Sequence, residues 1–257
     1  MLYRLGLIKE IAKQYKGNTA SILWHFFLKK PLPIKLEKET FYQNTDRSSF
    51  YHLVHSFPKI KKLVEAIPSN TEGVIIDGGA NNGLFSFHAA NKFPKAPIYA
   101  FEPYPLLHPI LHKNLNHKNV EVILKALARQ DGNTTLYISD DSDQIGSVYE
   151  ENVKAFGSIK NQLKVETISL DSFIREVSVD KIAVLKLDVQ GAELDILKGA
   201  KEAIDKIEFL ILEITLVEKH TFDLIEEARK HFPHHKIINP IGYGADILFS
   251  KVPLPTN

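Results

Sequence analysis

The chain has 257 residues, of which 44% are hydrophobic and 25% are charged, and its formal net charge is +1. This length suits one large α/β domain with a well-buried core, or at most two small domains. The near-neutral charge argues against a nucleic-acid binder held mainly by phosphate contacts. The absence of cysteine excludes a disulfide framework, a thiolate metal site and a catalytic thiol.

The N-terminal part is typical of a flank rather than of a domain with its own core. Apolar residues at helical spacing predict one or two amphipathic helices over residues 1–30. Residues 34–46 alternate loosely and predict a hairpin or an extended segment, and residues 48–67 predict a further helix. We therefore expect a helical and extended flank over residues 1–70, on the substrate side of a domain that spans residues 71–257.

The most hydrophobic early run, residues 22–28, is flanked by Lys29 and Lys30. We expect this run to pack on its own domain, with weak peripheral membrane contact as the alternative. No run approaches the ~18 apolar residues that span a bilayer. The N-terminus lacks the small-residue cleavage site of a signal peptide. On these grounds we expect a cytoplasmic protein without a transmembrane segment.

From residue 73 onward, apolar strand-like runs alternate with helical patterns, which predicts a mostly parallel sheet with helices on both faces. The expected strands are residues 74–76, 98–101, 120–124, 134–138, 165–170, 182–188, 209–213, 236–238 and 245–249. The expected helices are about residues 83–92, 106–116, 192–205 and 219–231, with a short one after Asp171. Because Gly242 and Gly244 join the last two strands tightly, these strands should be antiparallel neighbours.

Residues 139–162 interrupt this alternation with a polar and irregular stretch. Two interpretations stay open for it, a mobile surface loop and a substrate-side flap. Its aspartates, Asp140, Asp141 and Asp143, do not have the spacing of an EF-hand loop, so we infer no calcium site.

Residues 73–83, Gly-Val-Ile-Ile-Asp-Gly-Gly-Ala-Asn-Asn-Gly, predict a cofactor-binding loop. A buried strand ends at Asp77, three glycines follow within six residues, and a helical pattern then begins. Glycine permits a positive φ and a close approach to a ligand, and the amides of a helix N-terminus favour an anionic group. The alternative is a plain strand–helix turn that happens to be rich in glycine.

Four expected strands end in a carboxylate: Asp77, Glu102, Asp188 and Glu213. Ligands of open α/β sheets bind outside the carboxyl ends of the strands, and Glu102 lies where such a sheet places the acid that binds ribose hydroxyls. Crowded carboxylates repel one another unless a cation is near. A cationic cofactor would relieve this repulsion and a pyrophosphate would increase it, which favours a sulfonium donor over NAD.

Residues 186–200 form a second informative stretch. Gly191 permits a sharp turn from strand to helix, and Glu193 lies in the first helical turn, where the macrodipole favours an anion. An ordinary acid at a helix start is the alternative for Glu193. Asp188 and Glu193 could also bind a metal, but no histidine lies nearby to complete a familiar ligand set, so we expect no metal site.

These segments resemble the FkbM family of S-adenosylmethionine-dependent methyltransferases, over about residues 34–250. The matching segments are Asp77-Gly78-Gly79-Ala80-Asn81-Asn82-Gly83, Phe101-Glu102-Pro103, the Lys186–Glu193 stretch and Leu212-Glu213-Ile214. The resemblance implies a class I (Rossmann-like) methyltransferase fold, with a mostly parallel seven-stranded sheet whose last strand is antiparallel. It also implies that S-adenosylmethionine is the cofactor, and family members commonly methylate hydroxyls on sugars, glycolipid headgroups or polyketide-type products.

The resemblance also assigns roles to residues. The cofactor-binding residues that it implies are Asp77, Gly78, Gly79, Ala80, Asn81, Gly83, Glu102 and Asp188. The loop residues would hold the methionine part and Glu102 the ribose, while Asp188 would lie near the transferred methyl. Gly78 departs from the apolar residue that is common at its position.

Methyl transfer to a hydroxyl needs positioning of donor and acceptor and a base that takes the hydroxyl proton. The candidate catalytic residues are Asp188, Glu193 and Glu213, with His220 ranked last. We expect O-methylation of a sugar, glycan, glycolipid or secondary metabolite, with a small-molecule or glycan acceptor and no nucleic-acid partner. One alternative is an NAD-dependent oxidoreductase or epimerase. Such an enzyme would ordinarily have the pattern Gly-x-Gly-x-x-Gly, whereas this chain has Gly78-x-Ala80-x-x-Gly83. The other alternative is a non-catalytic cofactor-binding module.

Overall fold

The computed structural model describes residues 24–25, 28, 30–36, 39–44, 55–116, 119–140, 146–216, 219–241 and 244–254. Most of the helical segment expected over residues 1–30, and the first part of the one expected over residues 48–67, lie outside the described residues. In the part of the chain that the structure describes, no helix is both long and apolar enough to cross a bilayer.

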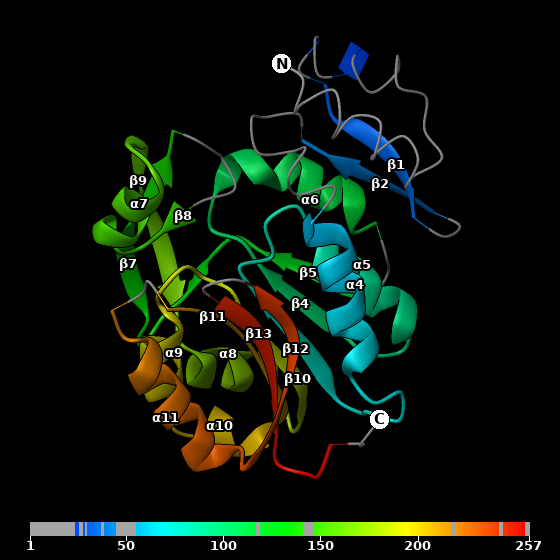
Figure 1. Ribbon diagram of the computed structural model, residues 1–257, viewed down its shortest axis with the longest axis vertical. Helices are drawn as coiled ribbons and strands as arrows, with labels where there is room; N and C mark the ends of the chain where they lie inside the picture. Colours follow the sequence, from blue (N-terminus) through cyan, green and yellow to red (C-terminus); the bar gives the residue numbers. More distant parts are fainter. Residues whose placement is uncertain are drawn as a thin grey trace.

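The central element is a seven-stranded sheet in the order β12-β13-β11-β10-β3-β4-β5 (Figure 1). Its strands are β3 (Val74–Gly78), β4 (Ile98–Phe101), β5 (Val120–Ile123), β10 (Ile182–Leu187), β11 (Ile207–Thr215), β12 (His234–Ile241) and β13 (Gly244–Ser250). The neighbours from β5 to β11 pair in parallel, and β13 is antiparallel to both of its neighbours. The predicted mostly parallel sheet with an antiparallel last strand is confirmed.

Helices cover both faces of this sheet (Figure 1). One layer contains α4 (Phe57–Ala66), α5 (Leu84–Lys92) and α6 (His108–Asn114), which the 3-10 turn Pro105–Leu107 precedes. The other layer contains α8 (Leu170–Glu176), α9 (Glu193–Gly199), α10 (Ala203–Lys206) and α11 (Thr221–His231). Each helical layer forms an apolar cluster with its own face of the sheet. Because both faces are covered, β10 is buried along its whole length, as is usual for a central parallel strand.

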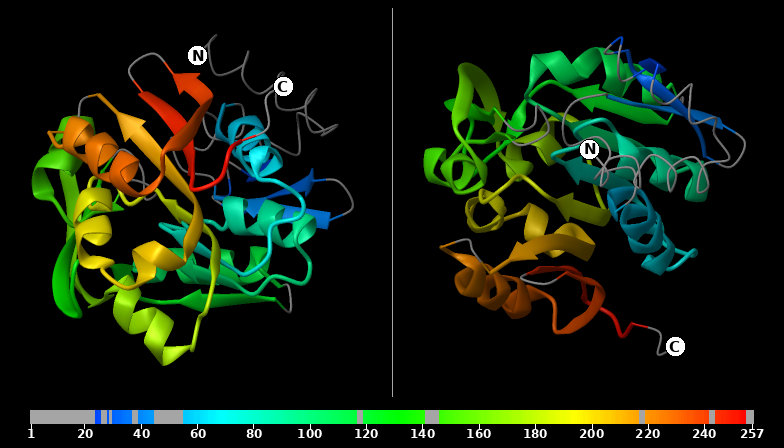
Figure 2. Two further views of the ribbon diagram at one scale, coloured as in Figure 1. Left: turned by 90° about the horizontal axis from the view of Figure 1, so that it is seen from below. Right: turned by 45° about the horizontal axis from the view of Figure 1, so that its top comes forward.

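The hairpin expected near residues 34–46 is present as β1 (Leu32–Leu36) and β2 (Glu39–Gln43), which pair antiparallel. It packs on α5 and α6 (Figure 2). Phe41 is fully buried, and its ring meets the ring of Phe87 edge-on at 5.3 Å between centroids. The hairpin therefore shares a core with the helices that flank the predicted cofactor loop.

A second sheet, in the order β6-β9-β7-β8, interrupts the alternation after β5. It contains β6 (Ala126–Leu127), β7 (Gly132–Ser139), β8 (Gly146–Ser147) and β9 (Ile159–Ile168), with α7 (Glu150–Phe156) before β9. The expected irregular stretch over residues 139–162 is therefore largely wrong, because it contains β8, α7 and the start of β9. The first half of β9 is mostly solvent-exposed and polar. It therefore lacks the apolar pattern of a buried strand, although it pairs with β7.

Candidate active site

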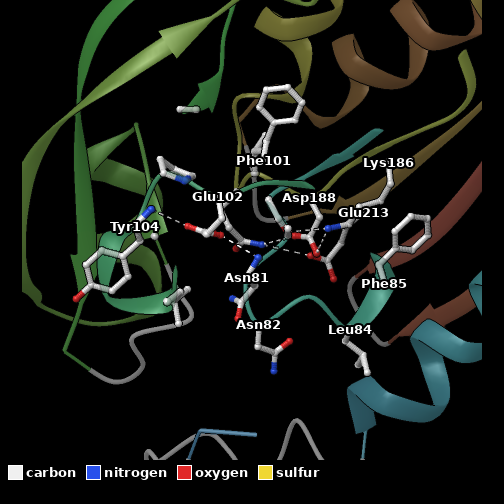
Figure 3. Close-up of a pocket in the computed structure, with 18 of the residues that line it drawn as sticks. Asn81, Asn82, Leu84, Phe85, Phe101, Glu102, Tyr104, Lys186, Asp188 and Glu213 are labelled. Carbon is white, nitrogen blue, oxygen red and sulfur yellow. Dashed lines mark hydrogen bonds and ion pairs between the residues drawn. The ribbon is translucent and has the colours of Figure 1, made fainter. Parts of the chain in front are cut away.

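A cavity of about 280 Å³ opens at the carboxyl ends of β3, β4, β10 and β11 (Figure 3). Its walls come from the β3–α5 loop, the end of β4, the turn after β10 and the end of β11. The second sheet, β2 and α4 complete it. Of the predicted cofactor-binding residues, those that line the cavity are Gly79, Ala80, Asn81, Glu102 and Asp188.

The β3–α5 loop wraps tightly against neighbouring backbone. The amides of Gly79 and Ala80 both donate to the carbonyl of Phe101, at 3.1 and 2.9 Å. Gly79 has φ +75°, and a Cβ there would lie 2.0 Å from the carbonyl oxygen of Asp188. A side chain at this position would therefore collide with backbone, which explains the glycine.

The buried ion pair between Asp77 and Lys186 holds this loop from behind. Asp77 is 0% exposed, accepts a 2.7 Å hydrogen bond from Ser86 Oγ, and lies 3.1 Å from Lys186 Nζ through Oδ1. Lys186 also donates to the carbonyl of Gly79 at 2.9 Å. Burial acts to lower the pKa of Lys186, but the charges of Asp77 and Asp188 outweigh it and raise the pKa above its ordinary value.

Three of the predicted cofactor-binding residues, Asp77, Gly78 and Gly83, are not among the residues that line the cavity. Asp77 faces Lys186 and Ser86 inside the protein. A Cβ on Gly78 would meet Leu187 and Leu127, and one on Gly83 would meet leucine side chains of the α6 region. These residues shape the loop from behind rather than facing the cavity.

Glu102, at the end of β4, is buried at the centre of the cavity wall. Its carboxylate accepts from the amides of Asn81 at 2.9 Å and Tyr104 at 2.8 Å. Burial raises the pKa of Glu102 to about 7, and the two amides act against this rise. The apolar side chains that line the cavity include Phe101, Tyr104, Leu107, Leu127, Leu136, Ile138 and Val148. The part of the cavity around Glu102 therefore combines a hydrogen-bond acceptor with an apolar wall that suits a flat ring.

Asp188 and Glu213 form a carboxyl pair on the other side of the cavity (Figure 3). The side-chain amide of Gln190 donates to both, at 2.8 Å to Asp188 Oδ1 and 3.3 Å to Glu213 Oε2. The charge of Asp188 and burial raise the pKa of Glu213 to about 8. Burial also acts to raise the pKa of Asp188, but the ammonium of Lys186 outweighs it and lowers that pKa. The pair therefore combines an anionic carboxylate with one that titrates near neutral pH.

Lys59, on α4, is a charged cavity residue that the sequence analysis missed. Its Nζ lies 2.8 Å from Glu213 Oε1 and 3.2 Å from Asp246 Oδ1. Asn239 ties this group together by donating to Asp246 Oδ2 at 2.9 Å and to the carbonyl of Lys59 at 3.0 Å. In sequence, Lys59 looks like its neighbours Lys61 and Lys62 on an amphipathic helix, and no local signal distinguishes it.

No group of three or more His, Cys, Asp or Glu side chains among the described residues is arranged to hold a metal ion. The ammonium of Lys59 forms ion pairs with the carboxylates of both Glu213 and Asp246.

Glu193, a predicted candidate base, is not among the residues that line the cavity. Its two carboxylate oxygens accept from the amides of Val189 at 2.8 Å and Gly191 at 2.9 Å, and the residue is 3% exposed. The carboxylate therefore supports the turn after β10. His220, the last-ranked candidate, is exposed, lies 3.3 Å from Asp223 and is not among the lining residues.

Residues 77–238 match the family model of the methyltransferase FkbM domain. Methyltransferase 1 of Beauveria bassiana is 28% identical over 191 residues, which cover 67% of this chain and 77% of that protein. The hexuronic acid methyltransferase AglP of Haloferax volcanii is 32% identical over 174 residues, which cover 66% of this chain and 67% of AglP. The 2-O-methyltransferase NoeI of Sinorhizobium fredii is 25% identical over 166 residues, which cover 60% of this chain and 68% of NoeI.

Among solved structures, Aeropyrum pernix fibrillarin with bound S-adenosylmethionine is 12% identical with a TM-score of 0.47. That similarity covers 86% of this chain and 82% of the fibrillarin chain.

Proposed function

The chain belongs to the FkbM methyltransferase family, and on this premise we propose that it methylates a hydroxyl group of a sugar-like or secondary-metabolite acceptor. It is a methyltransferase, and its cofactor is S-adenosylmethionine. The observation that carries the proposal for a hydroxyl acceptor is the carboxyl pair of Asp188 and Glu213, which lines the cavity and accepts hydrogen bonds from the side-chain amide of Gln190.

The residues of the cavity fit this cofactor. The Glu102 carboxylate suits a ribose hydroxyl pair, and the apolar wall beside it suits an adenine ring. Gly79 lets the loop that would hold the methionine part pack directly against the backbone of Asp188. The carboxylates of Asp188 and Glu213 suit a neighbouring sulfonium. When bound, S-adenosylmethionine supplies an electrophilic methyl group.

The acid–base work falls to the carboxyl pair. A hydroxyl acceptor must lose its proton as the new C–O bond forms, and a base is most effective when its pKa lies near the working pH. Glu213, with a pKa raised to about 8, takes this proton in our proposal. Asp188, whose pKa is lowered by Lys186, stays anionic and orients the hydroxyl by accepting its hydrogen bond.

Two further observations support a sugar-like acceptor. NoeI and AglP are named for 2-O-methylation and for hexuronic acid. The cavity wall around Glu213 is polar, with Lys59 and Gln190 as hydrogen-bond donors. We also propose that residues 1–70 form a substrate-side flank of a methyltransferase domain over residues 71–257, since Ser56, Phe57 and Lys59 line the cavity.

The experiment is transfer of radiolabelled methyl from S-adenosylmethionine to a panel of glycans and hydroxylated secondary metabolites. Wild type should label at least one hydroxyl, and Glu213→Gln should lower kcat while its affinity for S-adenosylhomocysteine stays the same. Labelling of a nitrogen or carbon position only would refute O-methylation. Binding of the cofactor without transfer to any acceptor class would favour a non-catalytic module.

A further inference from the structure

Gln43, the last residue of β2, carries a buried amide group with one unused donor. The residue is 0% exposed and lines the cavity. Its Oε1 accepts from Asn82 Nδ2 at 2.6 Å, while its Nε2 is buried and has no hydrogen-bond partner among the described residues. A buried donor without an acceptor is destabilising, and native structures contain few of them. The unused donor is therefore a reason to look for a ligand.

The position of Gln43 is set by a polar network rather than by chance. Asn114 on α6 accepts from the amide of Tyr42 at 2.7 Å and donates to the carbonyl of Tyr42 at 2.8 Å. The same Asn114 amide donates to the carbonyl of Asn82 at 2.8 Å. One side chain thus fixes both the end of β2 and the β3–α5 loop, so the Gln43 amide is held at the cavity wall.

This end of the cavity favours a negative charge. It lies at the N-terminus of α5, a nine-residue helix with no side-chain cap and no acidic residue in its first turn. Helix N-termini carry a partial positive charge and free amides. In Figure 3, Asn82 and Leu84 lie below Asn81, away from Glu102, Asp188 and Glu213. The acid that contacts the first turn of α5, Asp77, accepts from Ser86 and is paired with Lys186.

The geometry points to a carboxylate subsite formed by Gln43 Nε2 and the N-terminus of α5, which binds the carboxylate at the amino-acid end of S-adenosylmethionine. This inference rests on the proposed function. The cofactor carries one carboxylate, at the end opposite its adenine ring, and the apolar wall that suits adenine lies beside Glu102. The β1–β2 hairpin lies outside the region that the family model matches, residues 77–238. Gln43 is thus a cofactor-binding residue that the hairpin of this chain supplies.

The test compares two ligands that differ at this end. S-adenosylhomocysteine has the amino-acid group, whereas 5′-methylthioadenosine keeps the adenosine and the thioether and lacks the carboxylate. Gln43→Leu should weaken the binding of S-adenosylhomocysteine by about 10-fold or more, the scale of a hydrogen bond to a charged group. Its affinity for methylthioadenosine should change less than about twofold, as measured by isothermal titration calorimetry. Gln43→Glu should weaken S-adenosylhomocysteine further, through charge repulsion.

The matched control is Thr40→Val, on the same strand, whose hydroxyl accepts a hydrogen bond from Lys35. This variant should bind both ligands as wild type does, and thermal unfolding checks that all variants fold. Unchanged affinity of Gln43→Leu for S-adenosylhomocysteine, or an equal loss for both ligands, would overturn the subsite while leaving the proposed function intact. If wild type binds no S-adenosylhomocysteine, the proposed function fails, and the subsite fails with it.

Discussion

Replacement of Lys59 by methionine tests the electrostatic arrangement of the site without reference to the acceptor. Methionine keeps most of the apolar stem of lysine and removes the ammonium that lies 2.8 Å from Glu213 and 3.2 Å from Asp246. The Lys59 and Glu213 side chains are 17% and 28% exposed, so water screens the pair only in part. We expect Lys59→Met to destabilise the fold and to raise the pKa of Glu213 above about 8.

The magnitude follows from Coulomb's law and the partial exposure. Two unit charges ~4 Å apart interact by about 4 kcal/mol at an effective dielectric constant of ~20. Removal of one partner of a buried pair costs about 3–5 kcal/mol. Because the Lys59–Glu213 pair is partly solvated, we expect a loss of about 2–4 kcal/mol in the free energy of unfolding at about pH 9, where Glu213 is ionised in wild type.

The pH dependence gives the sharper result. The pKa of Glu213 is raised from 4.5 to about 8 on folding, so its stabilising contribution is present below about pH 4.5 and is lost as the pH rises toward 8. Without Lys59 this decline continues to higher pH. The deficit of Lys59→Met should therefore be larger at about pH 9 than at about pH 6, where Glu213 is mostly protonated in both proteins.

Urea unfolding at the two pH values measures both effects. The control is Lys61→Met, on the same helix, where an exposed lysine lies 3.9 Å from Glu65 and should contribute only about 0.5 kcal/mol or less. Equal deficits for Lys59→Met at both pH values would refute the coupling to Glu213. A loss no larger than that of Lys61→Met would refute the whole electrostatic account.

Three further predictions concern the cofactor, the chemistry and metal dependence. Glu102→Ala should weaken S-adenosylmethionine binding by about 1.5–3 kcal/mol in calorimetry, and unchanged affinity would remove Glu102 from the ribose site. Asp188→Asn should fold normally and lower kcat, but by less than Glu213→Gln, which removes the proposed base and should cost roughly 10²–10⁴-fold. Glu193→Gln should mainly lower the midpoint of thermal unfolding, since its carboxylate binds two turn amides; a loss of turnover in Glu193→Gln but not in Asp188→Asn would exchange the roles of these two residues. Methyl transfer should survive EDTA, and a loss restored by magnesium would show that the acidic residues bind a metal.

The main sheet could be predicted because its central strands are buried on both faces. β10 is an almost unbroken apolar run, and its single charged residue, Lys186, is used by the buried ion pair with Asp77. The second sheet gave a weaker signal. Its strand β9 is largely exposed along its first half, so its side chains carry little apolar periodicity, and its identity as a strand comes from pairing with β7, distant in sequence.

The same distinction separates the site residues that were predicted from those that were missed. Glu102, Asp188 and Glu213 end parallel strands, and topology alone brings such ends to one edge of a sheet. Gln43 and Lys59 come from elements that precede the sheet, and only the packing of β2 and α4 brings them to the cavity. For Glu193 the sequence could not distinguish two arrangements, because an acid beside a turn can face either a ligand or the turn's own amides, and the structure shows the second.

The second sheet also bears on the chemistry, through Gln190. Ser147 Oγ and Asn152 Nδ2 both donate to the carbonyl of Gln190, at 2.7 and 2.8 Å. Gln190 has φ +58°, and its side-chain amide donates to Asp188 and Glu213. Two residues of the β8–α7 region thus hold the backbone of the residue that orients the carboxyl pair. A change of side chain in that region can therefore alter the arrangement of the carboxyl pair without contacting it.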